Sequence, residues 1–359
     1  MAHCFGERAT PDFTHKVGTV DDKGVLWKAT SMPGKFVTQL EPAMDTCYTS
    51  LVVAAKRFAG KQVAGQRPIL KKTVVDGFEK LELGPYEYIT YDTYASRVEK
   101  IGSGFKAYLS AGDTCMIYAD TQLDWMISAF GCWKLGCVVA TCYATLGEDG
   151  ALFAINQSKA KLVVADAKLL KVLGKIAGQF TELKQVVTLT DEAADSASAI
   201  LLKSHGINVA KLSDVEAAGE ANPVAATPAA ADTPAVLMYT SGTTGNPKGV
   251  LISHKNITAA IGGSGVDGAA LKQYLTFGAR FLAYLPLAHI MEFALEVACI
   301  SLGIVIGYAG VGTLLRTCVR PPRDLMRARA ARAAANHVCV STRDRSDGAE
   351  DGAVSAASG

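Results

Sequence analysis

Residues 115–190 alternate between short apolar runs and segments with helical patterning, and this alternation constrains the fold more than any other feature of the sequence. The apolar runs predict strands at 115–118, 137–141, 161–166 and 185–190. Strands that alternate with helices of about ten to fifteen residues form parallel sheets whose faces are covered by those helices. The expected fold class is therefore α/β, with parallel sheets flanked by helices.

The segments between these strands carry signals for the ends of helices. Thr121 and Asp124 have the spacing of a capping box, which predicts that a helix begins there. Gly136 would end this helix, because glycine favours the position that follows the last helical turn. Two further helices are expected, at 147–157 and at 169–177.

At 359 residues the chain is too long for one compact unit. Residues 217–235 have no hydrophobic periodicity and contain three prolines, which predicts a flexible or surface-running connector between two subdomains. The expected division is an N-terminal extension (1–40), a first α/β subdomain (41–216), the connector, a second and incomplete subdomain (236–315) and a tail (316–359).

The tail differs in composition from the rest of the chain. Residues 1–315 contain 23 Lys and 5 Arg, whereas residues 316–359 contain 8 Arg and no Lys. This change predicts a disordered Arg/Ala-rich segment, which is either a frame or splice artefact or a natural basic tail. Residues 1–315 also contain 29 acidic residues and carry a net charge near −1, so we expect no nucleic-acid partner.

Residues 293–315 are apolar enough to suggest a membrane span, although Glu296 and four glycines interrupt them. We expect instead a buried helix at about 289–302 and a buried strand at about 304–308, with the membrane span as the alternative.

The nine cysteines are scattered singly, and the N-terminus lacks the pattern of a secretory signal. Buried free thiols and a cytoplasmic location are therefore expected.

The segment YTSGTTGNPKGV, residues 239–250, lies between apolar runs that predict strands at 236–240 and 250–253. Its hydroxyls and the backbone N–H groups of its glycines, Gly249 included, can form a concave surface that binds tetrahedral anions. Lys248 adds a mobile positive charge suited to a phosphate. The segment therefore predicts a polyphosphate site, with a plain glycine-rich hairpin as the alternative.

This segment does not match a Walker A loop. That pattern places a glycine immediately before the lysine, whereas Pro247 precedes Lys248 here. A Walker A loop also leads into a helix, whereas a second strand is expected here, followed by a helix from about Asn256 and a strand at 281–285. A phosphotransferase is therefore a less favoured hypothesis.

Three stretches resemble one enzyme superfamily. YTSGTTGNPKGV is similar to the phosphate-binding signature of the AMP-forming acyl and aryl adenylate synthetases, which include acyl-CoA synthetases, peptide-synthetase adenylation domains and luciferases. YLPLAHIMEF, residues 284–293, resembles the next motif of that superfamily, around its substrate-carboxylate site. Residues 118–150 resemble eukaryotic long-chain fatty acyl-CoA synthetases in particular, and the likeness covers roughly residues 40–315.

The resemblance implies the large N-terminal domain of the adenylate-forming superfamily, in incomplete form, and a two-step reaction. A fatty carboxylate attacks the α-phosphate of ATP and releases pyrophosphate, and the thiol of CoA then displaces AMP from the acyl-adenylate. The implied small molecules are a long-chain fatty acid, ATP with Mg²⁺, and CoA. Peripheral contact with the endoplasmic reticulum or another membrane, and a homodimer, stay open.

The resemblance also implies roles for individual residues. His289 would lie near the carboxylate and the α-phosphate as a catalytic residue, although a histidine at the start of a helix is often a cap. Glu292 is either a helix-start charge or a support of the active site, and His254 is expected to be structural. The residues that would hold the β- and γ-phosphates with Mg²⁺ are Thr240, Ser241, Gly242, Thr243, Thr244, Gly245 and Lys248.

Later motifs of the superfamily have no counterpart in this sequence. No YGxTE or TGD sequence follows residue 293, so the glutamate that binds Mg²⁺, the aspartate that grips the ribose and the C-terminal lid domain are not identified. Because each lost preorganised donor typically costs about 10²–10³ in rate, we expect little or no ligase turnover from this chain alone. The alternative function is a non-catalytic remnant, a pseudoenzyme or interaction partner that keeps part of the nucleotide or acyl site.

Overall fold

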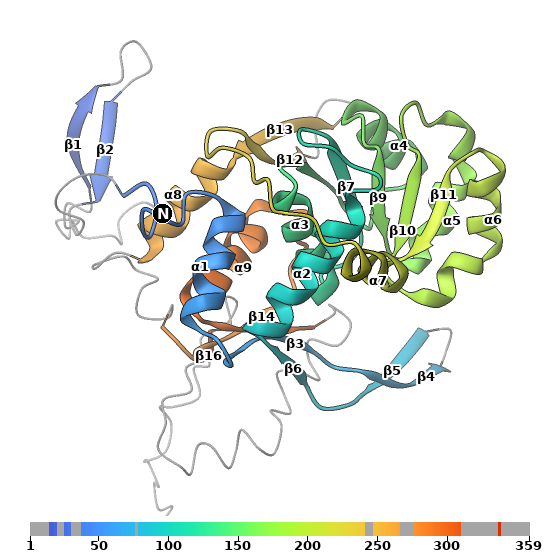
Figure 1. Ribbon diagram of the computed structural model, residues 1–359, viewed down its shortest axis with the longest axis horizontal. Coiled ribbons are helices and arrows are strands. Elements are labelled where there is room, and N and C mark those ends of the chain that lie inside the picture. The colour runs from blue at the N-terminus through green and yellow to red at the C-terminus, as the bar shows by residue number, and fades with distance from the viewer. Residues whose placement is uncertain are drawn as a thin grey trace, which may run out of the picture.

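The computed structural model describes residues 14–19, 25–29, 37–75, 78–240, 247–265, 276–309 and 337–338. Two β-sheets, with helices between and around them, form the body of the molecule (Figure 1). The α/β class that the sequence predicts is confirmed, and most neighbouring strands in both sheets are parallel.

The larger sheet has seven strands. In spatial order they are β11 (Asn208–Lys211), β10 (Gln185–Thr188), β9 (Leu162–Ala165), β7 (Thr114–Tyr118), β8 (Val138–Cys142), β12 (Pro234–Thr240) and β13 (Lys248–Ser253). Neighbours are parallel except at one edge, where β13 runs antiparallel to β12. The strands predicted between residues 115 and 190 are all present, as β7, β8, β9 and β10.

The second sheet has five strands. In spatial order they are β16 (His337–Val338), β14 (Arg280–Ala283), β15 (Val305–Tyr308), β3 (Gln62–Gln66) and β6 (Glu87–Thr90). All neighbours are parallel except β6, which runs antiparallel to β3. Two antiparallel pairs lie outside these sheets: β1 (Thr14–Thr19) with β2 (Val25–Ala29), and β4 (Ile69–Val75) with β5 (Phe78–Leu83).

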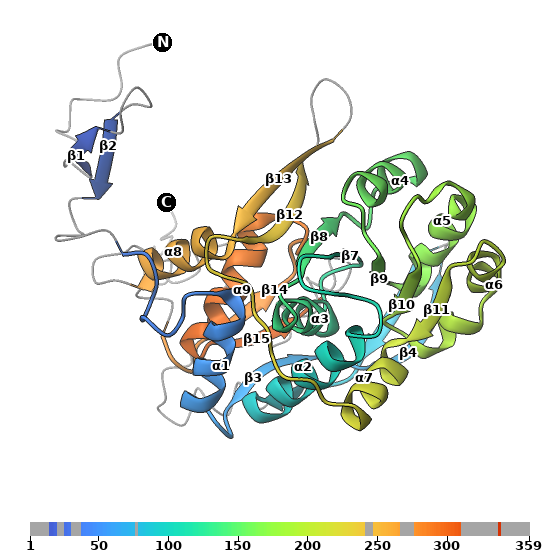
Figure 2. The same cartoon turned by 45° about the horizontal axis from the view of Figure 1, so that its top comes forward.

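The alternation of side chains along β7 divides the core into two clusters. Cys115 and Ile117 point to one face of the seven-stranded sheet, and Met116 and Tyr118 point to the other. The first cluster is formed with α1 (Cys47–Arg57), α2 (Tyr91–Phe105), α3 (Leu123–Lys134), α7 (Leu212–Ala221), α8 (His254–Gly265) and α9 (Ile290–Leu302). The second is formed with α4 (Glu148–Gln157), α5 (Leu170–Lys175) and α6 (Ala197–Ser204) (Figure 2).

The first cluster also includes Phe281 of β14 and Ile306 of β15, so the core is continuous between the two sheets. Helix α3 contacts β7 and β8 on one side and β3 on the other, and α9 joins β14 to the parallel strand β15. The helical layer between the sheets therefore fixes the loops that leave the ends of β7, β8 and β14.

The two ends of α3 compare differently with prediction. Gly136 follows the helix with a φ of 71°, in the left-handed region, and ends it as expected. The residue at the N-cap is Gln122, and no side chain caps this end, so the capping box predicted at Thr121 is wrong. The physical reason is a competing partner, because the Thr121 hydroxyl donates a hydrogen bond to the distant carbonyl of Leu285.

Two other segments also depart from prediction. Helix α7 continues to Ala221, so the irregular structure predicted from residue 217 is wrong for the start of the connector. Farther along, the N–H of Thr227 donates to the carbonyl of Lys134 at 2.8 Å, which holds the connector against α3. The helix predicted at 169–177 is divided into α5 and two flanking 3₁₀ turns.

The apolar stretch that begins at residue 293 is a helix followed by a strand. Helix α9 ends at Gly303, which has a φ of 78°, and the buried strand β15 follows. Within the part of the chain that the structure describes, no helix is long and apolar enough to cross a membrane.

The described cysteines are buried and free, as predicted. The tail from residue 316 lies outside the described residues except for β16.

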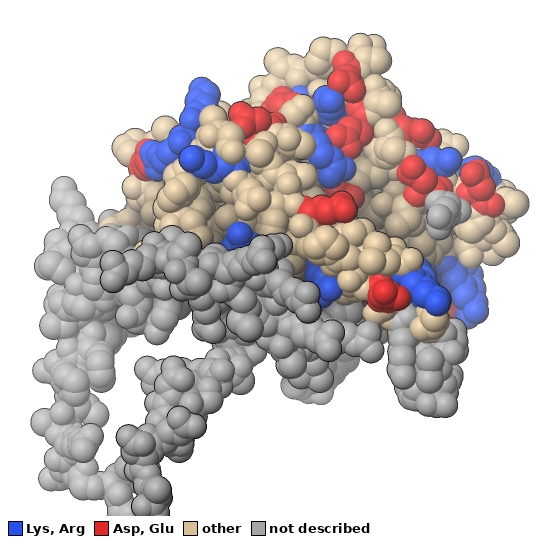
Figure 3. All heavy atoms as spheres, turned by 90° about the horizontal axis from the view of Figure 1, so that it is seen from below, with Lys and Arg blue, Asp and Glu red and all other residues tan. Residues whose placement is uncertain are grey.

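The charged side chains on one face of the molecule are mixed in sign. On the face drawn in Figure 3, lysine and arginine alternate with aspartate and glutamate among uncharged residues. Exposed ion pairs such as Lys255 with Asp232, and Lys100 with Glu220, show the same local balance of charge. Pairs of this kind contribute little to stability, because water screens them.

Candidate functional site

The glycine-rich segment is carried by the hairpin of β12 and β13, at one edge of the seven-stranded sheet (Figure 2). Thr240 pairs with Lys248 at the end of this hairpin, so the segment leaves the sheet at the carboxyl end of β12. A strand follows the segment, as predicted, and Lys248 is exposed. The residues of the predicted phosphate site that lie outside the described residues are Ser241, Gly242, Thr243, Thr244 and Gly245.

The base of this hairpin is fixed by packing. A Cβ atom on Gly249 would lie 2.9 Å from Leu237 Cδ1 and 3.4 Å from Tyr239 Cε1, so glycine lets these side chains pack against β13. The Tyr239 hydroxyl donates a hydrogen bond to the carbonyl of Ala154 at 3.1 Å, which ties β12 to α4. Gly249 therefore has a packing role where the sequence suggested close approach to a ligand.

His289 caps the first turn of α9. Its Nδ1 accepts a hydrogen bond from the N–H of Met291 at 3.2 Å, and its own N–H donates to the carbonyl of Pro286 at 2.9 Å. The side chain is exposed. Because Nδ1 is the acceptor, the neutral ring carries its proton on Nε2, which is then a hydrogen-bond donor. The cap role and a role toward a ligand are therefore compatible in one residue.

Two threonines from the seven-stranded sheet hold the segment that leads to His289. Thr121, just after β7, donates to the carbonyl of Leu285 at 2.5 Å and accepts from the N–H of Leu287 at 2.9 Å. Thr141, in β8, donates a longer hydrogen bond of 3.5 Å to the carbonyl of Ala288. The segment between β14 and α9 is therefore fixed against the carboxyl ends of β7 and β8.

These contacts bring the two sequence motifs to the same edge of the sheet. Strand β8 is parallel to β12, and Thr141 pairs with Met238, two residues before Thr240. The glycine-rich segment therefore starts at the end of β12, and the turn that ends at His289, which follows β14 of the other sheet, lies against the end of the neighbouring strand β8. In open α/β sheets, ligands bind outside the carboxyl ends of the strands.

Glu292 lies in the first turn of α9 but is 1% exposed, so it is not a surface charge at a helix start. Burial raises the pKa of Glu292 to about 8, and a hydrogen bond from the backbone of Tyr284 opposes this shift. The carboxyl thus supports the turn that starts at Tyr284 from inside the core.

One helical turn later, Glu296 is fully buried and accepts a hydrogen bond from the Tyr308 hydroxyl at 2.6 Å. Burial and the neighbouring Glu292 raise the pKa of Glu296 well above its ordinary range. Among the described residues neither carboxyl has a cationic partner to offset its desolvation, so burial favours the neutral form of both.

His254 is a core residue, as expected. Its Nδ1 accepts from the N–H of Cys47 at 3.3 Å, and its ring meets the Trp133 ring edge to face at 5.8 Å. Burial lowers the pKa of His254 to about 4, so the ring is neutral at physiological pH. This histidine packs α8 against α3.

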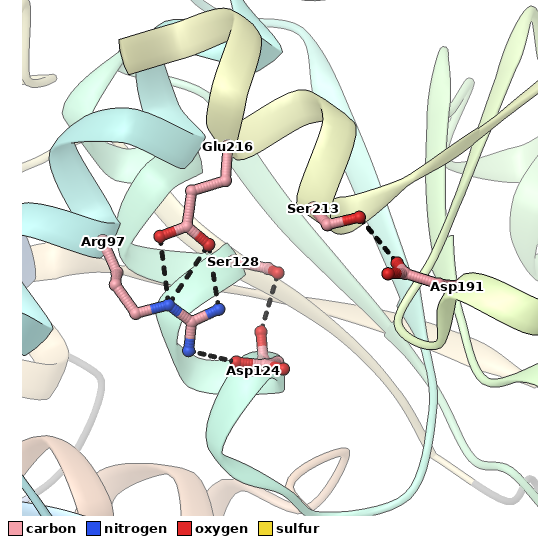
Figure 4. A network of polar contacts seen from close by, with 6 residues as sticks. All are labelled: Arg97, Asp124, Ser128, Asp191, Ser213 and Glu216. Carbon is pink, nitrogen blue, oxygen red and sulfur yellow. Dashed lines mark hydrogen bonds and ion pairs between the residues drawn. The ribbon is translucent and has the colours of Figure 1, made fainter.

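The structure also contains a polar network that no sequence pattern predicted, near β10 and β11 (Figure 4). Arg97 contacts Asp124 at 2.7 Å and Glu216 at 3.0 Å, and joins α2 to α3 and α7. The Ser213 hydroxyl donates to Asp191 at 2.6 Å beside them. These residues line an open pocket of about 390 Å³, next to β10 and away from the β12–β13 hairpin. The network joins three helices.

No cluster of three or more metal-ligating side chains is present among the residues that the structure describes. In an ATP site the phosphate oxygens themselves supply several ligands of Mg²⁺, so few side chains are needed.

Comparisons with known proteins identify the same family. A family model described as "AMP-binding enzyme" matches residues 61–327. The long-chain-fatty-acid–CoA ligase 2 of Schizosaccharomyces pombe is 33% identical over 80% of this chain and 44% of its own length. The long chain acyl-CoA synthetase 8 of Arabidopsis thaliana is 33% identical over 74% of this chain and 37% of its own length. The chain thus spans less than half the length of these curated relatives.

Solved structures show the same fold at lower sequence identity. The adenylation domain of a carboxylate reductase from Mycobacterium chelonae aligns with a TM-score of 0.64 at 20% identity, over 77% of this chain and 44% of that one. A putative long-chain-fatty-acid CoA ligase from Rhodopseudomonas palustris aligns with a TM-score of 0.59 at 18% identity, over 76% of this chain and 60% of that one. On the family match, the two motifs and this fold, the chain belongs to the AMP-binding enzyme family.

Proposed function

We propose that this chain forms the phosphate- and carboxylate-binding part of an AMP-forming long-chain fatty acid–CoA ligase. The observation that carries the proposal is the position of the two motifs at neighbouring strand ends, linked by Thr141, which pairs with Met238 and bonds to Ala288. The names of the relatives in fission yeast and Arabidopsis support the substrate class.

The chemistry requires two anions, a fatty carboxylate and a triphosphate, to approach each other. Donors and positive charge around the phosphates dominate such reactions, because they neutralise charge without rearranging. Lys248 and the backbone N–H groups of the glycine-rich segment, with the hydroxyls from Thr240 onward, would hold the β- and γ-phosphates. Mg²⁺ bound with the ATP would supply further charge neutralisation.

The proton on Nε2 of His289 suits this residue to a carboxylate or α-phosphate oxygen. The cap on α9 fixes the other ring nitrogen, so the tautomer is set before any ligand arrives. Glu292 would support the same turn from the core through Tyr284. CoA would then take the acyl group from the adenylate in the second step.

The proposed substrate bears on where the protein acts. We infer a cytoplasmic protein from its free cysteines, and peripheral contact with a membrane such as the endoplasmic reticulum because a fatty acid partitions into membranes. Sedimentation with phosphatidylcholine vesicles, with and without palmitate, tests this inference. Recovery of all the protein in the supernatant under both conditions would contradict it.

The test of function is formation of palmitoyl-adenylate from ATP, Mg²⁺ and palmitate, followed by mass spectrometry so that a few turnovers are detected. Because little ligase turnover is expected from this chain alone, we expect only a small amount of palmitoyl-AMP and pyrophosphate, a further loss of up to about 10²-fold in His289→Ala, and no loss in His205→Ala. His205 is an exposed histidine at the end of α6 and serves as the matched control.

Other outcomes of this assay would favour the other hypotheses. Nucleotide binding without any adenylate would favour a non-catalytic remnant. ADP in place of AMP would favour a phosphotransferase.

A further inference from the structure

The turn between β7 and α3 contains a hydroxyl that connects two distant parts of the chain. Thr121 Oγ1 donates to the carbonyl of Leu285 at 2.5 Å and accepts from the N–H of Leu287 at 2.9 Å. Both the donor and the acceptor capacity of one side chain are therefore used on the turn that precedes His289.

The backbone of this turn needs such partners. It lies between β14 and α9 without regular secondary structure, so its polar groups must bond elsewhere. Pro286 has no N–H, and its carbonyl accepts from the N–H of His289 at 2.9 Å. The groups on either side of the proline are the carbonyl of Leu285 and the N–H of Leu287, and Thr121 bonds to both.

The orientation of His289 depends on the same turn. Its N–H is bonded to Pro286, and its Nδ1 is bonded to the N–H of Met291, so the ring follows the backbone on both sides. The other side chain that contacts this backbone from the seven-stranded sheet is Thr141, whose bond to Ala288 is long at 3.5 Å. Thr121 provides the shorter bonds.

We propose that Thr121 is a positioning residue that fixes the turn at residues 285–289 and, through it, the imidazole of His289. Leu287 is 1% exposed, so its N–H would not regain a partner from bulk water if the hydroxyl were removed. The turn would then shift or open, and the cap on α9 would move with it. Only the activity measurement below rests on the proposed function.

Three variants separate positioning from general stability. Thr121→Val removes the hydroxyl and keeps the shape, whereas Thr121→Ser keeps the hydroxyl. Thr188→Val is the control, because Thr188 is a threonine at the carboxyl end of β10 in the same sheet and is more buried than the half-buried Thr121. Its hydroxyl makes one long bond of 3.4 Å, to Ala210, far from the turn in strand order.

The first readouts need no activity. In amide hydrogen exchange measured by NMR, we expect the N–H of Leu287 to exchange about tenfold faster or more in Thr121→Val, as an unsatisfied buried donor would. The ¹⁵N resonances of the His289 ring should shift or broaden in the same variant. Thr121→Ser should restore both signals, and Thr188→Val should leave both unchanged.

The activity readout is the rate of palmitoyl-adenylate formation. We expect Thr121→Val to lower this rate about tenfold or more with little change in nucleotide affinity, since the phosphates are held by another segment. If the wild-type chain forms no adenylate, the exchange and imidazole signals still decide the role of Thr121. Unchanged Leu287 exchange and His289 resonances in Thr121→Val, or equal changes in Thr188→Val, would overturn the proposal.

Discussion

Thr141 of β8 donates a hydrogen bond to the carbonyl of Ala288 at 3.5 Å, and the same residue pairs across the sheet with Met238 of β12. One residue thus connects the strand that leads into the glycine-rich segment with the turn that ends at His289. The turn follows β14 of the five-stranded sheet, yet it lies against the carboxyl end of β8, beside the end of β12 from which the glycine-rich segment starts. A ligand that extends from phosphate to carboxylate would fit across those ends.

A side chain at Gly249 is predicted to displace the Leu237 side chain, because a Cβ there would lie 2.9 Å from Leu237 Cδ1. Since this atom is the end of a flexible, half-buried side chain, Gly249→Ala should destabilise the protein by no more than about 1 kcal/mol and weaken nucleotide binding. Gly263→Ala is the control, because a Cβ at this helical position meets no atom within 4 Å and alanine favours the helix. Urea unfolding and nucleotide titration of both variants measure the difference. Equal stabilities would show that the hairpin can shift freely.

Because burial raises the pKa of Glu292, we predict that the free energy of unfolding falls as pH rises. Its pKa is about 8 in the folded chain and 4.5 is its usual value, so the unfolded chain binds fewer protons between these values. The contribution is complete below pH 4.5 and is lost as pH rises through 8, with a slope of about 1.4 kcal/mol per pH unit in between. Glu292→Gln, which mimics the neutral acid, should flatten this slope.

The slope is best measured between pH 6.5 and 8, by the urea midpoint at constant ionic strength. His254 adds an opposing slope near pH 6.5, where the unfolded chain is half protonated at this residue, and this slope fades towards pH 8. Glu296 contributes in the same direction as Glu292, so the variant should reduce the slope without abolishing it. A slope in Glu292→Gln equal to that of the wild type would contradict the burial of a neutral acid.

Because burial lowers the pKa of His254, we predict that this residue makes the free energy of unfolding fall as pH falls. Its folded pKa of about 4 lies below the usual 6.5, so its contribution is present above pH 6.5 and is lost as pH falls through 4. His254→Phe keeps an aromatic ring against Trp133 and cannot be protonated. We expect this variant to lose less stability than the wild type between pH 6.5 and 4. A parallel loss in both proteins would show that other groups cause acid unfolding.

The Arg97 network is predicted to matter for stability and not for nucleotide binding. Arg97→Met leaves Asp124 and Glu216 without their cation, at side-chain exposures of 20% and 21%, and should cost about 1–3 kcal/mol. Arg57→Met is the control, since the pair of Arg57 with Glu41 is more exposed and worth less than about 1 kcal/mol. Denaturant unfolding measures both, and equal losses would contradict a structural role for the network.

Local signals in the sequence were enough to predict that the chain is α/β. The apolar runs at β7, β8, β9 and β10 are short and separated by helical segments. Gly136 ends α3 because glycine adopts the left-handed conformation without strain. The order of the strands in space could not be predicted in this way. It depends on which helices cover which face of the sheet, and no single segment encodes that choice.

One failed prediction, the capping box, and one alternative left open, the role of Glu292, concern partners distant in sequence. Thr121 and Asp124 look like a capping box, but their side chains bond to Leu285 and Arg97 instead. Whether Glu292 is exposed depends on α9 lying between two sheets, which the sequence near residue 292 does not reveal. Local pattern therefore predicts elements well, whereas the use of each polar side chain depends on tertiary packing.

We propose that the glycine-rich segment binds the phosphates of ATP, and the effect of Lys248→Ala on ATP affinity is the direct test of this proposal. Lys248→Ala and the matched control Lys255→Ala, an exposed lysine paired with Asp232, are titrated with fluorescent ATP in the presence of Mg²⁺. We expect ATP to bind Lys248→Ala at least about tenfold more weakly than the wild type and Lys255→Ala with wild-type affinity, because a charged hydrogen bond to phosphate is lost in only one of them. Equal affinity of the wild type and Lys248→Ala would contradict it.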